Sequence, residues 1–284
     1  MRRAITLFLL ILKFASCSNI KTSSVEMGTN PKDSLKQRFI PHLNGDWVLT
    51  DYINSIEQNK SPLKSSSKLK GIVTLTFNNE INSDSIEVGA SWNNHEGYNF
   101  TVYFIEGQNP HSLKTNLPDY DLKTNYYELG YKRINNDTFL FLYHYDQSSK
   151  LIDSKKFTKV PSNQKDLDAA RGIQRIVNEK LFAGTYLFID NKNSSTKIQL
   201  NNDGTLTGLP GMQTYYVSTD FLGDPEAIHD EIAFNLNEKN STWYAYKIEN
   251  DTTFLYHITN QNGSESAKLG KMAYKLVRQN GVIK

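Results

Sequence analysis

The sequence of 284 residues contains a single cysteine, Cys17, and no long hydrophobic run. One cysteine cannot form an intrachain disulfide, so the fold must depend on its hydrophobic core. The most apolar segment, residues 4–12, is well short of the roughly 20 residues that a membrane-spanning helix needs. We therefore expect one or two domains that stand in aqueous solution, with no permanent transmembrane helix.

A surplus of positive charge is also missing. The formal net charge is +2 at pH 7, and three of the positive residues, Arg2, Arg3 and Lys13, lie in the N-terminal segment. Without these three charges the balance falls from +2 to −1. The composition therefore gives no basis for nucleic-acid binding.

Sequence motifs for catalysis, metal binding and phosphate binding are absent. There is no Gly-x-Ser-x-Gly motif, and the acidic stretch 223–232 lacks the spacing of a calcium-binding EF-hand loop. We predict no catalytic residue, no metal ligand and no cofactor. A hydrolase acting on an envelope polymer is a less favoured alternative, which would require His229 or His257 beside an acid or a nucleophile in a cleft.

The N-terminus has the pattern of an export signal. Arg2 and Arg3 precede the apolar run, and small residues then lead to Cys17. The segment Phe14-Ala15-Ser16-Cys17 resembles the lipobox of bacterial lipoproteins. That resemblance implies a signal peptide over residues 1–16, lipid attachment at Cys17 and anchoring in the bacterial envelope, with the outer membrane favoured and the face left open. An ordinary signal peptide is the alternative.

Residues 17–36 are rich in Ser, Thr, Asn and Lys, which is typical of a flexible tether. Beyond it, apolar and polar residues alternate in short segments separated by Asn, Asp and Gly. This period of two predicts antiparallel strands with one buried face, and hence a mainly β protein. One segment, 165–182, has helical spacing of its apolar residues, although Gly172 weakens that pattern.

Two halves of the chain share the same landmarks in the same order. Gly45 corresponds to Gly184, and NNDTFLFLYH at 135–144 corresponds to ENDTTFLYH at 249–257. Asn and Asp favour tight turns, so each copy of this repeat is expected to be a hairpin. We infer a duplicated β domain, with domain 1 at 37–161, a linker helix at 162–181 and domain 2 at 182–284.

Each half opens with a Gly-x-Trp or Gly-x-Tyr strand, namely Gly45-Asp46-Trp47 and Gly184-Thr185-Tyr186. These openings, followed by up-and-down strands, resemble the lipocalin-like domains of Gram-negative lipoproteins. The resemblance implies two tandem antiparallel β-barrels or half-barrels, which either hold a small apolar ligand or are filled by side chains. Such domains are usually binding modules.

Aromatic residues are the one abundant residue type that is suited to ligand binding. Four of them lie in two adjacent predicted strands: Trp243, Tyr246, Phe254 and Tyr256. They could line a pocket for a small apolar or sugar ligand, although ordinary cross-strand packing also uses aromatics. His144 and His257 follow Leu-Tyr in both halves, and we expect Tyr143 and Tyr256 to face inward. The favoured function is non-catalytic binding of a ligand or an envelope protein partner by a lipid-anchored protein. The alternative is a structural or assembly scaffold.

Overall fold

The computed structural model describes residues 31–77, 84–161, 169–222, 228–260 and 267–279. The predicted signal peptide, Cys17 and most of the tether lie outside these residues. Helix α1 (Pro31–Leu43) begins before the predicted end of the tether. The prediction of a flexible segment as far as residue 36 was therefore wrong for its last six residues, because the Phe39 and Leu43 side chains are buried and hold the helix against the first domain.

The first domain is a closed antiparallel barrel of eight strands in sequence order. Its strands are β1 (Gly45–Leu49), β2 (Ile72–Phe77), β3 (Ser85–Trp92), β4 (Glu96–Glu106), β5 (Ser112–Pro118), β6 (Tyr126–Ile134), β7 (Asp137–Tyr145) and β8 (Leu151–Val160). Pairing of Asp46 with Val160 joins β1 to β8 and closes the barrel. Leucines such as Leu129 and Leu140, both 0% exposed, fill its core.

The second domain is an eight-stranded antiparallel sheet in the order β11-β10-β9-β16-β15-β14-β13-β12. Its strands are β9 (Gly184–Asp190), β10 (Ser195–Leu200), β11 (Leu206–Thr207), β12 (Tyr215–Val217), β13 (Asp230–Phe234), β14 (Thr242–Glu249), β15 (Thr252–Asn260) and β16 (Ala267–Arg278). A single bridge between Thr205 and Thr214 lies beside the two short edge strands.

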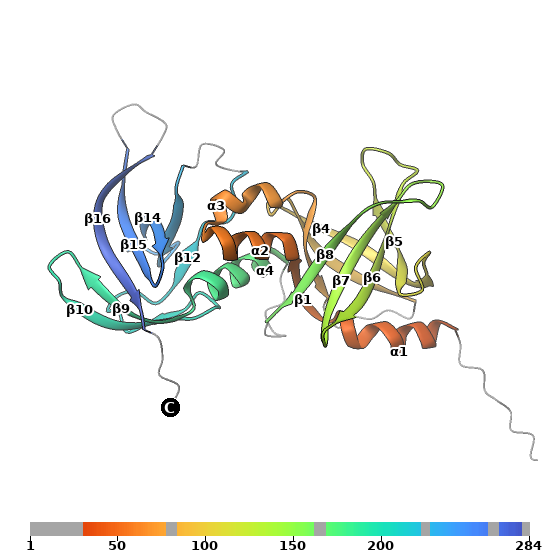
Figure 1. The fold of residues 1–284 in the computed structure, drawn as a ribbon, viewed down its shortest axis with the longest axis horizontal. Coiled ribbons are helices and arrows are strands. Elements are labelled where there is room, and N and C mark those ends of the chain that lie inside the picture. The colour runs from red at the N-terminus through yellow and green to blue at the C-terminus, as the bar shows by residue number, and fades with distance from the viewer. Residues whose placement is uncertain (1–30, 78–83, 162–168, 223–227, 261–266, 280–284) are drawn as a thin grey trace, which may run out of the picture.

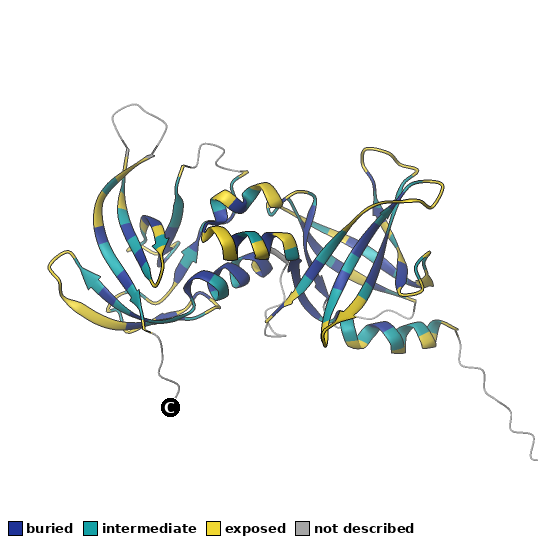
Figure 2. Cartoon of the chain, in the orientation of Figure 1, coloured by how far each residue is buried: buried dark blue, intermediate teal, exposed yellow. Residues whose placement is uncertain are grey.

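Helices lie between the two sheets (Figure 1). They are α2 (Thr50–Asn59), α3 (Pro62–Ser65), the short 3₁₀ turn η1 (Ser66–Lys68), α4 (Ala169–Val177) and the π-helical turn η3 (Asn178–Phe182). The predicted linker helix is confirmed over the described residues from 169 to 182. Figure 2 shows that these helices carry buried residues where they meet the sheets.

Gly172 has a packing role in α4. A Cβ atom at this position would lie 3.2 Å from the Val48 Cγ2 atom and 3.5 Å from the Thr74 Cγ2 atom. The glycine therefore lets α4 approach the outer face of β1 and β2. The same contact includes an ion pair of 2.6 Å between Arg175 on α4 and the buried Asp46 on β1. The residue that weakened the helical pattern in the sequence is the one that allows the helix to dock.

The repeated landmarks occupy equivalent places. Gly45 and Gly184 both have positive φ and both begin the first strand of their sheet. In the barrel, Asn135 and Asn136 have φ values of 50° and 70° and join β6 to β7 as a two-residue hairpin turn. Asn250, with φ 52°, stands at the corresponding turn between β14 and β15. The prediction of a mainly β protein made of two antiparallel sheets joined by a short helix is confirmed.

Candidate ligand-binding cleft at the mouth of the barrel

One end of the barrel is covered by α1, which runs across it in Figure 1. The Phe39 ring meets the Tyr131 ring edge-on at 5.1 Å. The Trp47 indole N–H donates to the carbonyl of Leu43 at 2.7 Å, which fixes the end of the helix over the barrel. The opposite end, where β3 and β5 end and β4 and β6 begin, is here called the barrel mouth.

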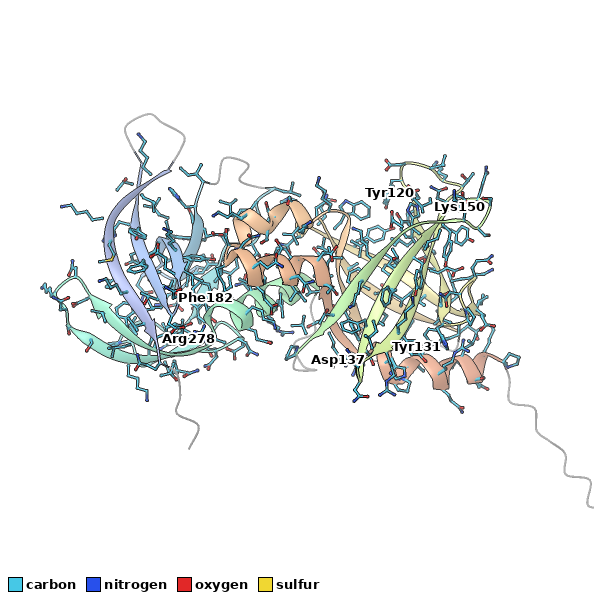
Figure 3. The ribbon with its side chains drawn as sticks, in the orientation of Figure 1. Tyr120, Tyr131, Asp137, Lys150, Phe182 and Arg278 are labelled. Atoms are coloured by element: carbon cyan, nitrogen blue, oxygen red, sulfur yellow. The ribbon has the colours of Figure 1, made fainter. Side chains whose placement is uncertain are left out.

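Three aromatic rings gather at the barrel mouth. The Tyr120 ring meets Trp92 edge-on at 5.9 Å and Tyr98 at 6.5 Å. Together with Glu96 and Gly97 these rings line a cleft of about 320 Å³. Tyr120 is 64% exposed and lies at the tip of this end of the barrel (Figure 3). Such exposure is unusual for a ring that only fills a core, and it leaves the aromatic surface free for a ligand.

A second depression of about 530 Å³ adjoins the cleft and shares Trp92 with it. Its other lining residues come from both domains: Ser66, Leu69, Lys70, Asn93, Phe221 and Leu222. The second domain is held here by two polar contacts. The Asn94 amide donates to the carbonyl of Thr219 at 2.8 Å, and His95 Nδ1 lies 2.6 Å from Asp220 Oδ2.

The loop that carries Tyr120 is organised by a single carboxylate. Asp119 is 7% exposed and accepts hydrogen bonds from the backbone N–H groups of Asp121 and Leu122 at 2.8 and 3.2 Å. The Asn125 amide donates to its other oxygen at 2.7 Å, and His144 Nε2 lies 3.0 Å from that same oxygen. Asp119 therefore closes the loop into a turn and sets the position of the Tyr120 ring.

His144 lies on the inward side of β7 with Leu140 and Leu142, so the expectation that Tyr143 faces inward was wrong. The register pairs Leu140 with the buried Phe157. Tyr143 lies on the outer side instead, where its ring is 2.8 Å from the position that a Cβ atom would take on Gly130. A glycine on the neighbouring strand leaves the space that this ring fills.

The His144 ring stacks on Tyr127 at 4.3 Å with an interplanar angle of 11°. Its Nδ1 atom lies 3.4 Å from Asp153 Oδ2. The histidine thus joins β6, β7 and β8 at the barrel mouth and supports the Asp119 turn, which follows β5. Its counterpart His257 is exposed and contacts Tyr244 with ring centroids 5.6 Å apart.

Burial raises the pKa of Asp119, but the hydrogen bonds that it accepts from Asn125, Asp121, Leu122 and His144 outweigh burial and lower it overall. The hydrogen bond with Tyr120, together with burial, raises the pKa of Tyr98 to about 12. Burial lowers the pKa of Lys155, whose Nζ atom contacts the carbonyls of Lys70 and Ile72. The Tyr98 phenol, which lines the cleft, is therefore uncharged at neutral pH.

The barrel-mouth cleft offers two kinds of surface to a bound molecule. The rings offer flat apolar faces, and the Glu96 and Asn93 side chains can form hydrogen bonds beside them. Across the described ranges, no group of three His, Cys, Asp or Glu side chains is placed to hold a metal ion.

The four aromatic residues predicted as a ligand site all lie in the second domain, but they do not share one site. Trp243 is 39% exposed and meets Tyr216 edge-on at 6.3 Å, and Phe254 lies under Lys275. Tyr246 is buried and meets Phe182 edge-on at 5.0 Å. Tyr246 and Tyr256 line one pocket, which Trp243 and Phe254 do not reach. The strand alternation that separates Trp243 from Tyr246 was visible in the sequence.

The barrel-mouth residues were missed because Tyr120 lies in a different loop from the β3–β4 hairpin that carries Trp92 and Tyr98. Trp92 and Tyr98 flank the turn at 93–95, and Tyr120 follows β5. A signal existed, since strand alternation places Trp92 at the end of β3 opposite the start of β4. The position of Tyr120 depends on the barrel closing.

Comparisons with protein-family models, curated proteins and solved structures gave no match. Among the described residues, no helix is long and apolar enough to cross a membrane. The function must therefore be argued from the site itself.

Proposed function

We propose that this is a lipid-anchored envelope protein that binds a carbohydrate-type ligand at the barrel mouth without catalysis. The observation that carries the proposal is the cleft formed by Trp92, Tyr98 and Tyr120, with Glu96 at its edge. The cleft and the adjoining depression, at about 320 and 530 Å³, have the size of small-molecule sites.

The chemistry of the cleft favours a sugar over a wholly apolar ligand. A sugar ring has an apolar face of C–H groups that can lie against an aromatic ring, and hydroxyl groups at its edge that need hydrogen-bond partners. Trp92 and Tyr120 provide the first feature, and Glu96 provides the second. An apolar ligand would make no use of the exposed Glu96 carboxylate at the edge of the cleft.

The anchor is proposed from the sequence, through the lipobox-like segment ending at Cys17. The described fold begins at Pro31 in α1, at the end of the barrel opposite the mouth (Figure 1). A chain anchored through Cys17 would enter the fold away from the cleft, so the ligand would have free access. A lipocalin-like relationship remains part of this proposal.

The first test is native mass spectrometry of the chain from Ser18 to Lys284, purified from its own host and then denatured to release any bound molecule. The second is a glycan array probed with the same protein and with the variants Trp92→Ala and Tyr120→Ala. Loss of one stacking ring should weaken binding by about 2- to 13-fold, since aromatic contacts contribute roughly 0.5–1.5 kcal/mol. Trp243→Ala is the matched control, because Trp243 is exposed outside the cleft. If no glycan binds, or if Trp243→Ala weakens binding as much as Trp92→Ala, the proposal is wrong.

A scaffold role is the second candidate. Exposed apolar side chains stand near the same end of the barrel, with Leu122, Leu151 and Ile152 between 48% and 54% exposed. Such residues are typical of a surface that meets another protein. Native mass spectrometry distinguishes the two functions, because a scaffold would retain another polypeptide and an empty cleft.

A further inference from the structure

Three buried polar atoms near the interface of the two domains have no hydrogen-bond partner among the described residues. They are the hydroxyls of Tyr52 and Tyr246 and the Nε2 atom of His229. Tyr52 is 0% exposed and Tyr246 is 6% exposed. Buried polar groups in proteins are nearly always hydrogen-bonded, so three such atoms in one region need an explanation.

The fold brings these atoms together from distant segments. Tyr52, Ile53 and Ile56 form the buried side of α2. In the second sheet, Asp230 pairs in register with Tyr246, so both side chains lie on one side of the sheet. Burial raises the pKa of Tyr246 most strongly, followed by the Asp230 carboxyl and then by the Tyr52 phenol.

Asp230 is hydrogen-bonded to the neighbouring helix α3. Its Oδ1 atom accepts from the backbone N–H of Leu63 at 2.8 Å. Burial raises the pKa of Asp230. The carboxyl therefore holds α3 against the second sheet.

A pocket of about 440 Å³ opens beside these groups. Tyr246 and His229 line it, and Lys60 and Lys64 lie at its rim with exposed side chains. Its apolar lining comes from Leu63, Ile228, Ile248, Tyr256 and Leu269. Asp230 is the one carboxyl group among its described lining residues. The pocket thus combines surplus hydrogen-bond donors and positive charge with an apolar wall.

We propose that this pocket binds an amphipathic carboxylate, a small organic acid with an aliphatic body. Its two oxygen atoms would accept hydrogen bonds from the Tyr246 hydroxyl and from His229, the two residues with unpartnered polar atoms that line the pocket. Its chain would lie against Leu63, Ile248 and Leu269. Lys60 and Lys64 would favour the anionic head over a neutral one. This site is separate from the barrel mouth, and the inference does not depend on the function proposed for that cleft.

The test is calorimetric titration of the chain from Ser18 to Lys284, which contains every described residue, with straight-chain carboxylates from butanoate to decanoate. We expect 1:1 binding that strengthens with chain length, and at least tenfold weaker binding of 1-octanol than of octanoate. Tyr246→Phe should weaken octanoate binding about tenfold. Tyr215→Phe is the matched control, because Tyr215 is a buried tyrosine of the same sheet whose hydroxyl donates to the carbonyl of Asn201 at 2.6 Å.

The proposal is overturned if no carboxylate of the series binds, if octanol binds as well as octanoate, or if Tyr246→Phe leaves the affinity unchanged. It is also overturned if Trp92→Ala abolishes octanoate binding, because the acid would then occupy the barrel mouth. Failure of the glycan experiment would leave the carboxylate result standing, so the two proposals fail separately.

Discussion

The replacement Tyr246→Phe is expected to stabilise the ligand-free protein. The Tyr246 side chain is 6% exposed, and its hydroxyl has no hydrogen-bond partner among the described residues. A buried hydroxyl in this state costs about 1–3 kcal/mol of desolvation. The void left by one oxygen atom costs only a few tenths of a kcal/mol, at about 24 cal/mol per Å³. The expected net gain in the free energy of unfolding is therefore about 1–2 kcal/mol, or a rise of roughly 2–8 °C in Tm.

The measurement is urea unfolding of the wild type, Tyr246→Phe and Tyr215→Phe, followed by circular dichroism. Tyr215 is 4% exposed, but its hydroxyl donates to the carbonyl of Asn201 at 2.6 Å. The Tyr215→Phe change should therefore lower the free energy of unfolding by about 0.5–1.5 kcal/mol. Two chemically identical replacements in one sheet should thus change the free energy of unfolding in opposite directions. Equal losses of stability in both variants would refute the reasoning, because they would mean that the Tyr246 hydroxyl is hydrogen-bonded in solution.

Three further predictions follow from the fold and the barrel mouth. Gly172→Leu should lower the free energy of unfolding by about 1–3 kcal/mol or more, because the added side chain meets Val48 and overpacks the contact between α4 and the barrel. An unchanged free energy in urea unfolding would contradict that packing. The hydrogen bond to Asp220 raises the pKa of His95. The stability that this pair contributes is present below the unfolded pKa of about 6.5 and is lost as pH rises through the raised value. The difference in Tm between the wild type and Asp220→Asn should accordingly shrink from about pH 6 to about pH 9; a constant difference would count against the ion pair. The pKa of Asp119 is lowered overall. The stability that its carboxylate contributes to the folded protein is therefore present above about pH 3.9, and it is lost as pH falls through the lowered value. Asp119→Ala should speed hydrogen exchange of the Leu122 amide at neutral pH, whereas unchanged exchange would show that another group holds the loop.

Local patterns in the sequence were sufficient to predict most of the sheet structure. The alternation in 98–104 appears as β4, and the repeated turns at 135–136 and 250–251 appear as hairpins. Helix α2 was missed, although Tyr52, Ile53 and Ile56 have helical spacing. The segment is short and polar overall, and only its burial against barrel strands β1 and β8 and the linker turn η3 makes that apolar side decisive.

The candidate site was predictable only in part. The sequence singled out Tyr246 and Tyr256, which line one pocket, together with Trp243 and Phe254, which do not. It gave no reason to connect Tyr52 with Tyr246, because nearly two hundred residues separate them and they lie on different elements, α2 and β14. The barrel-mouth rings were likewise hidden, since Tyr120 owes its position to the Asp119 turn.

The sequence by itself determined the properties that depend on neighbouring residues: the antiparallel strands, the hairpin turns and the linker helix. These follow from side-chain periodicity and turn preferences, which act over a few residues. Only the tertiary structure decided that the first domain closes into a barrel while the second keeps short edge strands, and which polar groups become buried together. Those outcomes depend on contacts between segments far apart in the chain, such as Asp46 with Val160 and Asp230 with Leu63, and no local pattern specifies them.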